Sequence, residues 1–368
     1  MGEVLTNSQI GGRRNIIING AMQVAQRGTS FTGVGNGDNA YYLDRFQYVE
    51  SGSPEGVFTI TQATDTPDGF ANSMKLDCTT AESALAANER VRIRQRIEGQ
   101  NLQQLKKGTS SAEKLTLSFH VKSTVTGTAI VNLYDADNNR HISKSYTVSS
   151  ADTWEKKIIT FEGDTTGALD NDNASSLELM FYIQAGSNFT SGTLATSWAS
   201  HSDANDAVGQ TINAASSTSN NFLLTGIQLE VGSVATPFEF RSFGEEQRLC
   251  QRYAIVYSKD GQPNMGQKAI ATGSSTNNSG DYQAYIFPQV TMRAVPSLTA
   301  GGSVSDYEIL KYETGFVDLS GSISLYSASG RSLFVLAIAS GTAEGERGRD
   351  VIMRLEGNNS SLLFDSEL

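Results

Sequence analysis

Short runs in which apolar and polar residues alternate strictly are the feature that most constrains this chain. In the run "LTLSFHVKS", alternate side chains point to opposite sides of an extended strand. One face carries Leu115, Leu117, Phe119 and Val121, and the other carries Thr116, Ser118, His120 and Lys122. Before residue 240, about ten such runs are separated by turn-forming residues, and almost none has the period of a helix. The pattern predicts an antiparallel two-sheet sandwich of the jelly-roll type.

The same patterning divides the chain into parts. The first strands are predicted in "NIIINGAMQVAQRG", from Asn15, and in "YYLDRFQYV", residues 41–49. A second series of short strands begins after residue 256 and predicts a second, smaller β-sandwich. The predicted division is a flexible polar arm (1–14), a jelly-roll domain (15–240), a connecting helix (241–256) and a C-terminal β-sandwich (257–368).

The composition limits which partners such a protein can have. Hydrophobic residues make up 38% of the chain, charged residues only 18%, and the formal net charge is -11. A surface made polar mainly by neutral groups is typical of secreted or particle-exposed β proteins. The negative charge argues against nucleic acid as a partner. No apolar run approaches the roughly 18 residues of a membrane span, so membrane insertion is not expected.

One local stretch is basic. In "ERVRIRQRIEG" the arginines alternate with other residues, so at strand spacing they share one face, opposite Val91 and Ile93. These arginines are Arg90, Arg92, Arg94 and Arg96. A solvated strand face explains the pattern, and a contact with an anionic sugar or another subunit is the alternative.

Residues that carry enzymatic chemistry form no recognisable motif. The three histidines, His120, His141 and His201, make no metal-binding pair in the sequence. Serine nucleophile elbows and phosphate-binding loops are absent too. A glycosidase needs only two carboxylates, and the 39 acidic residues leave such a pair possible, but no local pair stands out. We therefore predict no catalytic residue, no metal site and no enzyme. Cys78 and Cys250 are predicted to be buried thiols, although a disulfide between them is left open.

Two loops have the oxygen-rich composition that calcium prefers. They are "DADNN", residues 135–139, and "DNDN", residues 170–173. Turns in which Asp and Asn side chains bond to their own backbone explain both loops equally well. A structural calcium ion is the single cofactor that the sequence leaves open.

A neutral polar sandwich suits sugar recognition, in which polar side chains bind hydroxyls above an aromatic ring. His120, Tyr182 and Trp198 are the candidate glycan-binding residues on outward faces. Surface or subunit packing is the alternative for Tyr182, and capping of a sheet is the alternative for Trp198. Trp198 lies in a long low-complexity stretch, residues 187–219, whose length suggests a function or a covering role. Trp154 is predicted to be a core or sheet-edge residue.

The segment "LEVGSVATPFEFRSFGEEQRLCQRY", residues 229–253, separates the two domains. Pro237 ends the last strand because it has no N–H donor. Ser242 with Glu245 three positions later predicts a capping box and a short helix. An apolar stripe on this helix is formed by Phe243, Leu249, Cys250 and Tyr253. The stripe packs on its own chain or meets two further copies at a threefold axis.

Several of these segments together resemble a known group of proteins. They are "NIIINGAMQVAQRGTS", "YYLDRF", "RQRIEGQNLQQLKKGT", "LTLSFHVKS", "TWEKKIITFEGDTTG" and the 229–253 segment. The chain resembles tail-fibre and related virion proteins of marine bacteriophages, especially those that infect cyanobacterial and similar hosts. The resemblance covers essentially residues 15–368, and the 229–253 segment is its most specific part. Related sequences often have an aromatic residue where this chain has His120.

The resemblance implies a jelly roll similar to carbohydrate-binding modules and a distal, trimerising C-terminal domain. It also implies a non-enzymatic homotrimer that adsorbs the virion to host-surface polysaccharide or lipopolysaccharide, made in the host cytoplasm and carried in the viral tail. Attachment to other virion proteins would use the short arm, a face of the jelly roll or another fibre protein. The alternatives are a head decoration or fibre-adaptor protein and, third, an exopolysaccharide depolymerase.

Overall fold

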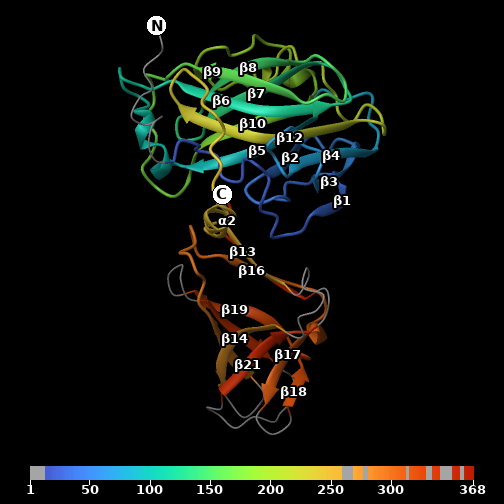
Figure 1. Ribbon diagram of the computed structural model, residues 1–368, viewed down its shortest axis with the longest axis vertical. Coiled ribbons are helices and arrows are strands. Elements are labelled where there is room, and N and C mark those ends of the chain that lie inside the picture. Colours follow the sequence, from blue (N-terminus) through green and yellow to red (C-terminus); the bar gives the residue numbers. More distant parts are fainter. Residues whose placement is uncertain are drawn as a thin grey trace. The chain divides into compact units, whose positions relative to one another are not determined.

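The computed structural model describes residues 13–258, 268–276, 281–311, 315–328, 334–339, 350–356 and 360–368. The chain forms two compact units, Met1–Glu246 with Leu368, and Gln247–Glu367. Both units are built from antiparallel strands, which confirms the all-β prediction (Figure 1). Most of the predicted arm, residues 1–12, lies outside the described residues. No helix in the described ranges is long and apolar enough to cross a membrane.

The first unit is a sandwich of two six-stranded sheets. In spatial order the first sheet contains β1 (Ser30–Val34), β3 (Val57–Ala63), β4 (Ser73–Thr80), β12 (Asn221–Val231), β6 (Leu115–Ser123) and β9 (Glu155–Phe161). The second sheet contains β11 (Ala199–Ser200), β8 (Arg140–Val148), β7 (Gly127–Asp135), β10 (Ser175–Ala185), β5 (Arg90–Glu98) and β2 (Gln47–Ser51). Some neighbours are consecutive strands, such as β3 with β4, whereas β12 pairs with β6 and β10 with β5 across long stretches of sequence, as the predicted jelly roll requires.

The apolar faces of the two sheets meet in one core. Phe119 of β6 packs edge-on against Tyr146 of β8 and Phe181 of β10, with ring centroids 5.0 Å apart in both pairs. Leu117 and Val121, its neighbours on the same face of β6, are also fully buried. The alternation seen in the sequence therefore selects the core face of β6 correctly.

Two predicted strands near the N-terminus are wrong or displaced. Residues 15–28 form no strand, because Asn19 and Met22 take left-handed backbone angles, with φ of 62° and 55°. This segment instead lies irregularly along β12, where the Ile16 amide donates to the Leu229 carbonyl over 2.9 Å. The second strand begins at Gln47, after Arg45 has turned the backbone with φ of 71°.

Residues 187–219 do have a covering role. Ala207 from this loop packs on Ile130, Met180 and Tyr182, which lie on the outward face of the second sheet. The loop contains two short 3-10 helices, η3 (Ser187–Phe189) and η4 (Asp203–Asn205). Two more, η1 (Gly99–Asn101) and η2 (Gln103–Leu105), follow β5. The outward face of the second sheet is thus a second, smaller core.

The second unit contains two sheets. The smaller has β13 (Ala254–Ser258), β22 (Ser361–Asp365) and β16 (Ser297–Gly301). The larger has β18 (Gly315–Asp318), β17 (Tyr307–Lys311), β21 (Asp350–Leu355), β14 (Lys268–Ser275), β15 (Asp281–Ile286), β20 (Phe334–Ala339) and β19 (Ile323–Ala328). A short 3-10 helix, η5 (Val304–Asp306), precedes β17. The predicted C-terminal β-sandwich is confirmed.

The connecting helix is shorter than predicted. Helix α2 spans Phe243–Gln251, and residues 254–258 pair with β22 as β13, so the predicted end at residue 256 is wrong. The helix begins as expected, since the Ser242 hydroxyl accepts a hydrogen bond from the Glu245 amide over 3.3 Å. Phe243 is 57% exposed, whereas Cys250 and Tyr253 are buried and Leu249 is half-buried. Cys78 and Cys250 form no disulfide and both are buried, as predicted.

Candidate functional site

His120 lies on the outward face of the first sheet. In β6 it pairs with Thr225 of β12 on one side and with Lys156 of β9 on the other. Its ring packs against Phe70, with centroids 5.2 Å apart. Partial burial, and secondarily the Lys156 charge, lower the pKa of His120 below its ordinary value. The imidazole is therefore neutral at physiological pH and acts as part of an aromatic surface.

Three phenylalanines extend this surface. The Phe70 ring lies 5.1 Å from that of Phe238 and 5.3 Å from that of Phe240, and the last two rings are 4.9 Å apart. Phe70 and Phe238 are half-buried, and Phe240 is 57% exposed. We call these three rings and His120 the aromatic face. None of the three phenylalanines was predicted as a binding residue, although the alternation in "PFEF", which begins at Pro237, is a signal that indicates two of them.

Hydrogen bonds hold the two segments that carry the aromatic face. The segment that carries Phe238 is tied to β12, because the Thr236 hydroxyl donates to Glu230 over 2.7 Å and the Glu239 amide donates to Gln228 over 2.8 Å. The loop that carries Phe70 is closed by the Thr66 hydroxyl, which donates to the Phe70 carbonyl over 2.8 Å. The rings are thus positioned before any ligand binds.

Polar groups adjoin the aromatic face where β6 continues from His120 to Lys122. The Lys122 ammonium donates to Asp65 over 2.8 Å, and the Trp154 indole N–H donates to the other oxygen of the same carboxylate over 2.9 Å. The hydrogen bond from Lys122, opposed by slight burial, lowers the pKa of Asp65. Trp154 itself is partly exposed, just before the edge strand β9, in agreement with its predicted sheet-edge position.

The other two predicted glycan-binding residues lie elsewhere. Tyr182 points outward from β10, but the 187–219 loop covers it completely and its exposed fraction is 0%. The prediction of an accessible tyrosine is therefore wrong. Trp198 is partly buried against the main core, donates its indole N–H to the Glu162 carbonyl over 2.7 Å and lies 5.0 Å from the Lys107 ammonium. These contacts match the alternative of sheet capping, and a sugar-binding role for Trp198 stays a prediction.

The arginine stripe of β5 is not the solvated face that the sequence favoured. Arg94 and Arg96 share the Glu178 carboxylate at 2.9 and 3.0 Å, and Arg90 binds Asp206 at 2.9 Å. Arg92 is buried and donates to the sulfur of Met180 over 3.3 Å. The stripe is engaged within the chain because the outward face of the second sheet is covered.

The two acidic loops contact each other. The Asp170 amide donates to Asp137 over 2.9 Å. The buried Asp135 carboxylate pairs with the Lys107 ammonium. It also accepts a hydrogen bond from the Asn138 backbone amide over 3.0 Å, the kind of local bond that stabilises Asp-containing turns. The Lys107 ammonium thus occupies the position beside Asp135 that a calcium ion would take. Calcium binding at these loops stays a prediction.

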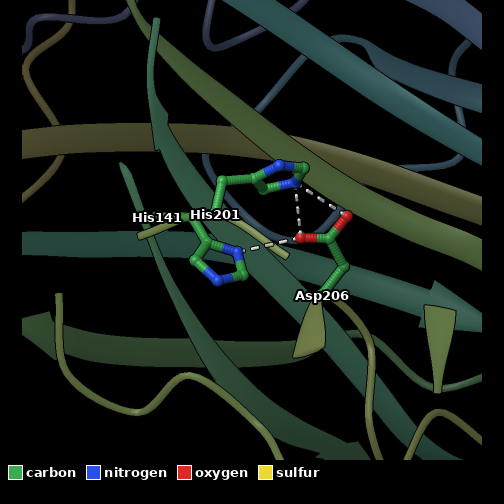
Figure 2. A group of neighbouring side chains, drawn as sticks. All are labelled: His141, His201 and Asp206. Carbon is green, nitrogen blue, oxygen red and sulfur yellow. Dashed lines mark hydrogen bonds and ion pairs between the residues drawn. The ribbon is translucent and has the colours of Figure 1, made fainter. Parts of the chain in front are cut away.

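The fold also gathers residues that the sequence kept apart. His141 of β8, His201 just after β11 and Asp206 just after η4 converge, as Figure 2 shows. The Asp206 carboxylate lies 2.9 Å from His141 Nδ1 and 3.2 Å from His201 Nε2. Burial would raise the pKa of Asp206, but hydrogen bonds from His141 and His201 and the Arg90 charge hold it below its ordinary value. The sequence predicted no such pair of histidines.

Comparison with known proteins gives distant structural likenesses. No protein-family model and no curated protein matches the sequence. The enzymatically active domain of bacteriophage CBA120 tailspike protein 4 shares 13% identity over 54% of this chain and 21% of its own, with a TM-score of 0.29. A sugar-binding protein of Bacteroides thetaiotaomicron, itself described as unproven in that role, shares 13% identity over 59% of this chain and 100% of its own, with a TM-score of 0.32. A family 11 carbohydrate-binding module of Clostridium thermocellum shares 13% identity over 55% of this chain and 95% of its own, with a TM-score of 0.28.

Proposed function

We propose that this protein is a receptor-binding component of a bacteriophage tail fibre, and that its aromatic face binds host-surface glycans. The observation that carries the proposal is the exposed Phe240 ring, supported from below by Phe70 and Phe238 on the outward face of a β-sandwich. Large aromatic rings offer a flat apolar surface to the C–H face of a sugar ring. Among the residues that the structure describes, most apolar side chains of this size are buried, so an exposed cluster of rings supports a binding surface here.

The neighbouring polar groups supply the second requirement of a sugar site. Lys122, Asp65 and Lys156 offer donors and acceptors near the rings. A small number of polar groups around an apolar surface fixes the orientation of a ligand. The net charge of -11 opposes a strongly anionic polysaccharide. We therefore expect a neutral glycan to be preferred.

The proposed activity is binding without cleavage. A glycosidase needs a carboxyl group that stays protonated near neutral pH, which requires a raised pKa. Asp65, the acid beside the aromatic face, has a lowered pKa because Lys122 and Trp154 stabilise its charged form. It is suited to accept hydrogen bonds from sugar hydroxyls.

A homotrimer within the viral tail, made in the host cytoplasm, completes the proposal. The sequence resemblance to tail-fibre proteins supports this assembly. Both sheets of the first unit end in open edge strands, β1 and β9 in one and β11 and β2 in the other. Edge strands gain protection when copies of a chain assemble.

A glycan array tests the binding proposal. The purified full chain is expected to bind neutral oligosaccharides on the array. The Phe240→Ala variant should bind soluble oligosaccharide about tenfold more weakly than wild type, because the loss of one aromatic contact changes affinity by about this factor. Phe287→Ala removes another exposed ring, 71% exposed in the second unit, and serves as the matched control. Equal binding by wild type and Phe240→Ala would refute the site. Binding to a virion protein through this face, without glycan binding, would favour the adaptor alternative instead.

A further inference from the structure

We infer that His141, His201 and Asp206 form a binding site for a divalent transition-metal ion of the zinc class. One potential ligand atom from each of these side chains lies within 4.8 Å of the other two. Figure 2 shows both imidazole rings directed at one carboxylate. Two histidines and one aspartate are a donor set that zinc and related ions accept, whereas calcium and magnesium prefer oxygen ligands alone.

The distances between the ligand atoms suit a single ion. Nitrogen and oxygen ligands of tetrahedral zinc each lie near 2.0 Å from the metal, so they stand about 3.3 Å apart. Here the Asp206 Oδ1 atom lies 2.9 Å from His141 Nδ1 and 3.2 Å from His201 Nε2. An ion between them requires only small side-chain movements, and it replaces the hydrogen atoms that these contacts otherwise share.

Neighbouring residues orient the three ligands, and the cluster is open to solvent on the His201 side. The Arg90 guanidinium pairs with Asp206 Oδ2 at 2.9 Å, whereas Oδ1 is the oxygen that lies nearer to both rings. His141 is fully buried, whereas the His201 side chain is 25% exposed and opens the cluster to solvent. Asp203 Oδ1 lies 3.8 Å from His201 Nε2 but pairs with the Arg90 guanidinium at 3.2 Å, so we expect water to complete the coordination. Partners of this kind, behind the ligands, orient metal sites.

The placement of the ligands gives the ion a structural role. His141 belongs to β8, but His201 and Asp206 belong to the 187–219 loop. An ion held by all three would fasten the loop onto the second sheet, over Tyr182 and the arginine stripe. Because an ion that binds only the folded chain stabilises it, we expect the melting temperature to rise with metal concentration.

The experiment uses the full chain, stripped of metal with a chelator and titrated with Co²⁺. We expect saturation at one ion per chain, visible absorption bands of Co²⁺ bound to nitrogen ligands, and loss of these bands when Zn²⁺ is added. His201→Ala and Asp206→Asn should abolish the bands. His201 is the better test, because its partial exposure makes unfolding of the variant less severe.

The histidine count supplies a matched control. The chain has only three histidines, and His120 lies on the first sheet, away from this cluster. His120→Ala should therefore keep the Co²⁺ bands and the Zn²⁺-dependent rise in melting temperature. The inference is overturned if the wild-type chain gives no saturable Co²⁺ spectrum, or if folded His201→Ala, checked by circular dichroism, binds as well as wild type.

Discussion

Gly226 lies directly beneath Phe70. A Cβ atom at position 226 would stand 2.7 Å from Cζ of Phe70 and 2.8 Å from Nδ1 of His120, closer than real contacts allow. The backbone at Gly226 also has φ of 61°, at an irregularity in the pairing of β12 with β6. Only glycine fits this conformation and this space together, so the missing side chain at Gly226 lets Phe70 and His120 pack closely against the backbone of β12.

Gly226→Ala should therefore damage the aromatic face. We expect Phe70 and His120 to be displaced and the free energy of unfolding to fall by about 2 kcal/mol, because the change combines a steric clash with an unfavourable backbone angle. Affinity for soluble oligosaccharide should fall with it. Chemical denaturation and calorimetric titration measure the two effects.

Gly244→Ala is the matched control for this substitution. Gly244 lies in α2, and a Cβ there would meet nothing within 4 Å. Alanine favours a helix by about 0.5–1 kcal/mol over glycine, so this variant should be equally or more stable and should bind sugar normally. If both alanine variants bind like the wild type, the aromatic face does not carry the binding.

Local patterns predicted strands well and contacts between distant segments poorly. Alternation identified the core face of β6 because burial there depends on neighbours two residues apart. It could not indicate that the 187–219 loop returns over β10 and buries Tyr182. Nor could it bring Phe240 beside Phe70, or His201 beside His141, because these contacts depend on how separate strands and loops are placed.

Arg92 should tolerate replacement by methionine. It is buried, its pKa is lowered mainly by burial, and no ion pair joins it to a carboxylate among the residues the structure describes. Loss of a buried charge that lacks a close partner removes its cost of desolvation. We expect Arg92→Met to unfold at the same denaturant concentration as wild type or a higher one. Arg94→Met, which leaves Glu178 and Gln47 with fewer partners, should be less stable than wild type.

Asp164 should make stability depend on pH in the acid range. Burial would raise its pKa, but two hydrogen bonds from Arg140, at 2.7 and 3.0 Å, and the nearby Lys107 ammonium lower it. A carboxyl with a lowered folded-state pKa stabilises the fold above its ordinary pKa of about 3.9, and this contribution is lost as the pH falls through the lower folded value.

Asp164→Asn removes this contribution. At pH 7 the variant should be less stable by about 3 kcal/mol, because Arg140 loses a nearly buried carboxylate partner. The difference from wild type should shrink as the pH falls below about 4, where the carboxyl is first protonated in the unfolded chain, and disappear only below the lower folded-state pKa. Urea denaturation at a series of pH values measures it, and a difference that stays constant down to the lowest pH would contradict the assignment.

The helix α2 offers a test of assembly that separates two of its apolar residues. Cys250 is fully buried within one chain, so its burial supports packing on its own chain, whereas Phe243 is 57% exposed and has surface left for another copy. If three copies meet at this helix, light scattering should give three chain masses for wild type and a smaller mass for Phe243→Glu, because a charge does not pack in an apolar contact. Cys250→Ser should instead lower the unfolding midpoint and leave the mass unchanged. A single-chain mass for wild type would exclude the homotrimer, and a trimer that persists in Phe243→Glu would place its contacts on another surface.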